Sequence, residues 1–122
     1  MNLPLVAPIN LPRQPSVTSE TLTLLCRVVE LVDDARVVLV DTSRRDDHTS
    51  VRIRTANGVP RDFIVSHRVA THDPNGMLRE RAAMWALDVA RAWEVERAGD
   101  GQAWGRTGRL DALHRIVREV SP

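Results

Sequence analysis

The segment over residues 73–98 has the strongest helical pattern in this 122-residue sequence. Its apolar residues recur at alternating spacings of four and three, which places them on one side of an α-helix. They are Leu78, Ala82, Trp85, Val89 and Ala92, with Ala86 and Trp93 widening the stripe. Asp73 or Asn75 can cap the start of the helix, and Gly99 can end it. We therefore expect a long helix whose apolar side faces the core.

Two shorter segments also have helical periodicity, one on each side of this helix. Residues 18–32 begin at Thr18 and Ser19, either of which can cap a helix with its side-chain oxygen. The apolar residues of this helix lie on one face. A last helix is expected over residues 107–120, and its apolar residues also lie on one face. They are Leu22, Leu25, Val29 and Val32 in the first, and Leu110, Leu113, Val117 and Val120 in the last.

Three runs between the first and second helices have the patterns of strands. Residues 36–40 form a short apolar run, as expected of a strand that is covered on both faces or central in a sheet. Residues 51–54 and 62–69 alternate, and Asn57-Gly58 between them is a hairpin signal. We prefer a three-residue loop over 57–59. It pairs Val51 with Val65, Ile53 with Phe63 and Arg54 with Asp62.

The expected fold is α+β, in the order α-β-β-β-α-α with an antiparallel three-stranded meander. A single domain over residues 16–122 suffices, because a chain of this length buries about two-thirds of its unfolded surface. Residues 1–15 carry four prolines, which prevent a regular helix and predict an extended arm. The arm either packs along its own domain, docks on a partner or exchanges between subunits of a dimer. Its apolar residues include Leu3, Leu5, Ile9 and Leu11.

Composition limits the partners and the compartment that we expect. The formal net charge of +1 is too small to indicate a polyanionic partner, although all seventeen basic residues are arginines. Cys26 is the only cysteine, and its apolar setting predicts a buried small side chain rather than a nucleophile. We expect no secretory signal, because prolines interrupt the apolar residues over 1–15, and we expect no membrane span, because no run approaches about 18 apolar residues. We therefore expect a cytoplasmic protein with no membrane partner.

Catalytic and metal sites have little support in the sequence. His67, His72 and Asp73 are possible metal ligands, but their spacing lacks the geometry of ligands one helical turn apart. We expect His67 to be a hydrogen-bonded residue at the edge of the core. Asp46 and Asp47 are paired carboxylates of a kind that hydrolases use to hold a divalent cation, yet a solvated charged loop over residues 41–48 is the favoured interpretation. We predict no cofactor, and a metal-dependent hydrolase is our third hypothesis.

Arginines on several predicted elements support a second hypothesis, a nucleic-acid-binding module. They are Arg44, Arg45, Arg52, Arg54, Arg115 and Arg118. The helix, three strands, helix order, together with Ala82-Ala83 and Ala86-Leu87, resembles the double-stranded RNA-binding domain over about residues 18–98. This resemblance implies contacts with the phosphates of an RNA duplex, which weaken as the salt concentration rises.

Protein recognition is our first hypothesis, because it needs no catalytic motif and several apolar features lack an evident cover. The apolar arm is one of them, and Trp104 in a glycine-rich loop is another. The long helix also carries a second apolar strip, which either the last helix or a partner covers. This strip contains Met77, Met84, Leu87 and Val95. We predict an adaptor, a stoichiometric inhibitor or a homodimeric subunit, and a compact protein from a phage or mobile element fits this description.

Overall fold

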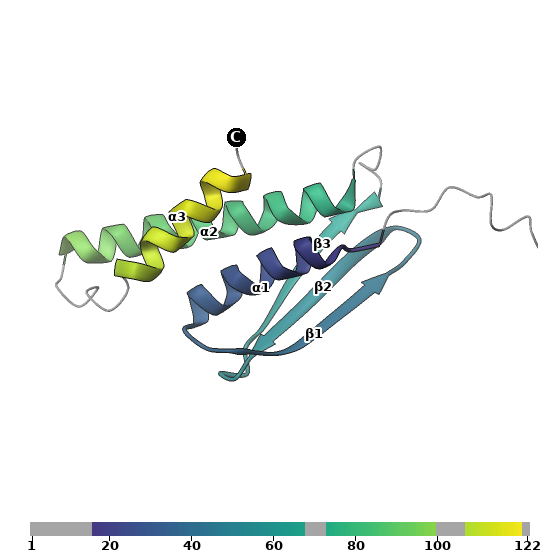
Figure 1. Ribbon diagram of the computed structural model, residues 1–122, viewed down its shortest axis with the longest axis horizontal. Helices are drawn as coiled ribbons and strands as arrows, with labels where there is room; N and C mark the ends of the chain where they lie inside the picture. Colours follow the sequence, from purple (N-terminus) through teal and green to yellow (C-terminus); the bar gives the residue numbers. More distant parts are fainter. Residues whose placement is uncertain (1–15, 68–72, 100–106, 121–122) are drawn as a thin grey trace, which may run out of the picture.

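The computed structural model describes residues 16–67, 73–99 and 107–120. The elements are α1 (Ser19–Asp33), β1 (Val37–Arg44), β2 (His48–Thr55), β3 (Pro60–Ser66), α2 (Pro74–Gly99) and α3 (Thr107–Val120). The strands form one antiparallel sheet in the order β1-β2-β3. The predicted α+β fold and its element order are therefore confirmed. The helices lie on one side of the sheet, with α2 and α3 packed side by side (Figure 1).

Hydrogen bonds at the helix ends explain where α1 and α2 begin. Thr18 caps α1, because its hydroxyl oxygen accepts the Thr21 N–H at 3.2 Å. Asp73 caps α2 in the same way, with a carboxylate oxygen that accepts the Asn75 N–H at 3.0 Å. The buried Asn75 side chain joins the two starts, since its Oδ1 accepts the Thr18 N–H at 2.8 Å and its Nδ2 donates to the Ser16 carbonyl at 3.0 Å.

The apolar side of α2 differs in part from the predicted stripe. Leu78, Ala82, Ala86 and Trp93 are buried as expected, together with Ala83 and Ala90. Trp85 and Val89 are only half-buried, and Ala92 is exposed. The reason is that α2 packs against α1 and α3 as well as β3, so its buried sector turns toward the neighbouring helices.

The pairing of β2 with β3 is shifted by two residues from the predicted register. Val51 pairs with Phe63, and Arg52 pairs with Asp62. Residues 56–59 connect the strands, with Gly58 in the left-handed region at a φ of 79° and its N–H donating to the Thr55 carbonyl at 2.9 Å. Because side chains alternate with a period of two, this shift keeps the expected apolar residues on the buried face. These residues are Val51, Ile53, Phe63 and Val65.

The position of β1 contradicts the sequence prediction. The apolar run was expected to be covered on both faces or central in the sheet, but β1 lies at the sheet edge and most of its residues are exposed. The strand also continues to Arg44, and β2 begins at His48, so only residues 45–47 of the predicted charged loop lie outside the sheet. The physical reason is that α1 and α2 pack mainly over β2 and β3. Near its start, β1 is held by Glu30, whose carboxylate accepts the Val37 N–H at 2.9 Å.

Candidate protein-interaction surfaces

Three consecutive apolar side chains are exposed on β1. Val38, Leu39 and Val40 have 57%, 41% and 40% of their surface accessible, and we call them the β1 patch. The pairing register with β2 shifts between Val37 and Leu39, as in a β-bulge. The patch therefore begins where the regular alternation of side chains in the strand is interrupted. A run of exposed apolar residues of this kind marks an interaction site more often than isolated surface residues do.

Among the described residues, β2 is the only strand next to β1. Some N–H and C=O groups of the β1 backbone point away from β2 and are not bonded to it. The hairpin between the two strands is closed by the Arg45 N–H, which donates to the His48 carbonyl at 2.8 Å. In an antiparallel pair, hydrogen-bonded and non-hydrogen-bonded positions alternate, so Val40 and Thr42 direct their N–H and C=O groups toward the free edge. Such an edge is a template for pairing with another strand.

The sheet face opposite the helices is more polar than the β1 patch. Arg52 and Asp62 form a two-pronged ion pair across β2 and β3, with Nε to Oδ1 at 2.7 Å and Nη2 to Oδ2 at 3.0 Å. The hydrogen bond from Arg52 lowers the pKa of the Asp62 carboxyl below its usual value. Arg54 and Ile64 are exposed on the same face. This face is therefore partly neutralised by its own cross-strand contacts.

The second apolar strip of α2 is divided between the core and the surface. Met77 is half-buried and packs against the core, and Leu87 is also half-buried. Met84 and Val95 are 60% and 74% exposed. Within the described residues, α3 therefore covers neither of them, and Met84 remains a candidate contact for a partner.

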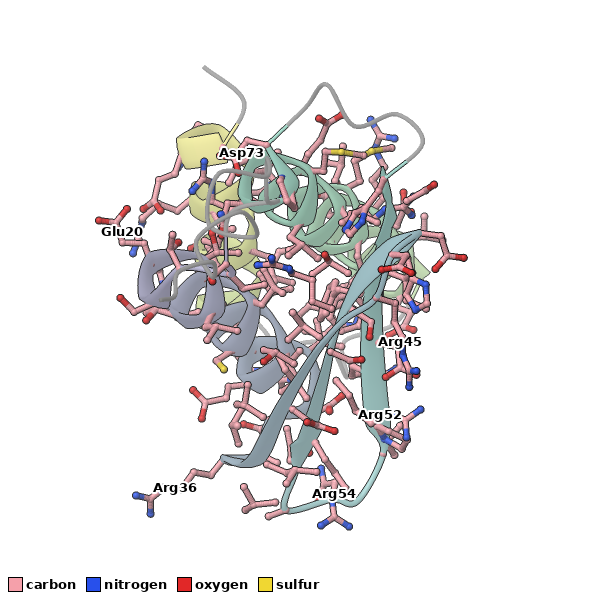
Figure 2. All side chains as sticks on the ribbon, turned by 90° about the vertical axis from the view of Figure 1, so that its right-hand side faces the viewer. Glu20, Arg36, Arg45, Arg52, Arg54 and Asp73 are labelled. Atoms are coloured by element: carbon pink, nitrogen blue, oxygen red, sulfur yellow. The ribbon has the colours of Figure 1, made fainter. Side chains whose placement is uncertain are left out.

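The six predicted nucleic-acid-binding arginines are divided between two layers of the structure. Arg44 ends β1, Arg45 follows it in the hairpin turn, and the exposed Arg52 and Arg54 project from β2. Arg45 and Arg52 lie on the side of the sheet away from the helices (Figure 2). The exposed Arg115 and Arg118 belong to α3, in the helical layer. The structure does not bring the six together, and binding of nucleic acid stays a prediction.

His67 takes the position at the edge of the core that the sequence predicts. Its Nε2 is 2.7 Å from the Thr49 hydroxyl, and its Nδ1 donates to the Asp46 carbonyl at 3.1 Å. In the neighbouring turn, the Asp47 carboxylate lies 2.8 Å from His48 Nδ1, and this hydrogen bond lowers the Asp47 pKa. The described part of the chain has no group of three or more His, Cys, Asp or Glu side chains placed to hold a metal ion.

Several predicted contacts lie outside the described residues. They are the arm residues Leu3, Leu5, Ile9 and Leu11, the possible metal ligand His72, and Trp104.

The β1 patch is the surface that the sequence reasoning missed. The sequence predicts a strand that includes Val38, Leu39 and Val40, but a continuous apolar run of this kind is typical of a buried strand. One signal pointed the other way, because the polar residues Asp41, Thr42 and Ser43 follow directly in the same strand. A strand central in a sheet and covered on both faces does not usually carry such a polar half.

The comparisons with known proteins gave no match: no family model, curated protein or solved structure is significantly similar to this chain. Among the described helices, none combines the length and apolarity that crossing a membrane requires.

Proposed function

We propose that this protein is a non-catalytic protein-interaction module of the cytoplasm that associates with a second copy of itself through β1. The observation that carries this proposal is the β1 patch, an apolar run exposed on a strand edge that no described element covers. Cys26 is the only cysteine and has no partner for an internal disulfide, which is compatible with a reducing compartment such as the cytoplasm. Burial and then the nearby Glu30 carboxylate raise the pKa of its thiol, which favours the unreactive protonated form.

A second copy is the favoured partner because the β1 patch is complementary to itself. Most homodimers have a two-fold axis, which brings the same surface of both subunits together. An antiparallel pair of β1 strands centred on Leu39 sets Leu39 opposite Leu39 and Val38 opposite Val40. All three exposed apolar side chains then face apolar side chains of the other copy. The small net charge of +1 opposes such self-association only weakly.

Sedimentation equilibrium of the full chain tests this proposal, with two variants that add the same charge at different exposed apolar sites. Leu39→Lys places a cation at the centre of the proposed interface. Val95→Lys places it on α2, where Val95 is 74% exposed and belongs to a different surface. We expect a dimer for the unmodified chain and for Val95→Lys, and a monomer for Leu39→Lys. A monomeric unmodified chain at high concentration, or equal association of the two variants, would refute the proposal.

A further inference from the structure

A groove follows the other edge of the sheet, between β3 and α2. It has a volume of about 540 Å³, which lies within the usual range for ligand pockets. Its lining includes every residue from Pro60 to Ile64, together with Arg81 and Trp85 of α2. Consecutive residues of a strand point to opposite faces, so a groove lined by all of them runs along the backbone edge. In the described part of the sheet, β3 pairs with β2 alone.

Aromatic side chains form the apolar part of this groove. Trp85 and Phe63 meet edge to face, with ring centroids 5.8 Å apart and planes at 70°. The Arg61 guanidinium lies over the Trp85 ring, 5.2 Å from its centroid. These contacts hold the Trp85 ring in place. Because Trp85 is only half-buried, part of its ring remains accessible to a ligand.

The charges of the groove favour a negatively charged ligand. Arg61 is already paired, since its Nη2 lies 2.6 Å from the Asp33 carboxylate. The acidic member of the lining, Asp62, is engaged by Arg52 at 2.7 Å. The Arg81 side chain is exposed and has no ion pair or side-chain hydrogen bond with any described residue. The groove therefore has one arginine whose charge and hydrogen-bond donors remain available to a carboxylate.

We infer that this groove binds an extended segment of another protein by strand addition to β3, with an acidic side chain of that segment paired to Arg81. Main-chain hydrogen bonds to the β3 edge supply affinity in this mode of recognition, and the side-chain pocket supplies specificity. The chain's own residues 1–15 are a poor occupant, because they contain no acidic residue and their four prolines lack N–H donors. The inference does not depend on self-association, which uses the opposite edge of the sheet.

Selection from a random 12-residue peptide library displayed on phage identifies the probe, with the full chain as target. We expect the selected peptides to share an Asp or Glu at a fixed position among residues with high strand propensity. A synthetic peptide from the selection is then titrated calorimetrically against the unmodified chain, Arg81→Gln and Arg91→Gln. Arg91 is the matched control, since it is exposed on α2 and does not line the groove.

Arg81→Gln should weaken binding about tenfold or more, as expected for loss of a charge-assisted hydrogen bond, and Arg91→Gln should leave it unchanged. A peptide with its acidic residue changed to Gln should bind weakly to the unmodified chain and no more weakly to Arg81→Gln. Amide NMR signals of residues 60–64 should shift on binding. Failure to select peptides, equal binding by Arg81→Gln, or shifts confined to β1 would each overturn the inference.

Discussion

Arg109 is the residue that joins the end of α1 to the other two helices. Its Nε donates to the Leu31 carbonyl at 2.7 Å, and its Nη2 donates to the Val32 carbonyl at 3.0 Å. The last carbonyls of a helix have no partner within that helix, so an arginine from α3 supplies the missing donors. The guanidinium also lies 4.9 Å from the centroid of the Trp93 ring on α2.

Replacement of Arg109 should therefore destabilise the fold. We expect Arg109→Gln to lower the free energy of unfolding by about 1.5 to 3 kcal/mol, because charge-assisted hydrogen bonds to partly buried carbonyls are lost. Arg115→Gln on the same helix is the control, since Arg115 is exposed and its replacement should change the free energy by less than about 0.5 kcal/mol. Urea unfolding measures both. Equal effects would contradict the role assigned to Arg109.

The Arg52–Asp62 pair should make a small, pH-dependent contribution to stability. Arg52 lowers the pKa of Asp62 in the folded protein. The contribution is thus present above the unfolded aspartate pKa of about 3.9 and is lost as the pH falls through the lower folded value. Both side chains are substantially exposed, so solvent screening keeps the coupling free energy of the pair small. A double-mutant cycle with Arg52→Gln and Asp62→Asn, at pH 7 and pH 2, measures it. A coupling that grows on acidification would be the wrong sign.

At the scale of the elements, periodicity predicted the helices but could not fix their contacts. The sequence predicted Thr18 or Ser19 as the cap of α1, of which Thr18 is the observed one, and it predicted the bounds of α3, because both depend on local sequence. The β2–β3 register could not be predicted in the same way, since a shift of two residues buries the same alternating side chains. Only the residues around Gly58 distinguish the predicted register from the observed one. The exposure of Leu39 had only an indirect signal in the sequence, the polar residues that follow it, because the exposure depends on which strands the distant helices cover.

Asn75 fixes the relation between two elements, and its removal should be costly. Asn75→Ala leaves the Thr18 N–H and the Ser16 carbonyl without their observed partners, so we expect a loss of about 2 kcal/mol of unfolding free energy. Asn57→Ala provides a comparison with the same change at an exposed position, where one hydrogen bond to the Asp33 carbonyl is lost. It should cost less than about 1 kcal/mol. Thermal or urea unfolding that ranks the two in the opposite order would contradict this assignment.

At the scale of the whole molecule, the two proposals use opposite edges of the sheet, with self-association at β1 and peptide binding at β3. Pairing of β1 strands would join two three-stranded sheets into one continuous sheet, with the β3 groove of each copy at an outer border. The dimer would then present two grooves, and a partner with two acidic segments would bind more tightly than a single segment. The predicted contact Met84 is on α2 and belongs to neither sheet edge, and the predicted contacts Leu3, Leu5, Ile9, Leu11 and Trp104 are outside the described residues. Their roles stay predictions.

Amide hydrogen exchange of β1 over a range of protein concentrations tests the central claim most directly. The N–H of Val40 points toward the free edge and would face Val38 of the other copy, whereas the N–H groups of Asp41 and Ser43 point toward β2 and serve as internal controls. We expect exchange at Val40 to slow as the concentration rises, with little change at Asp41 and Ser43. Fast exchange at Val40 that is independent of concentration would contradict self-association through β1.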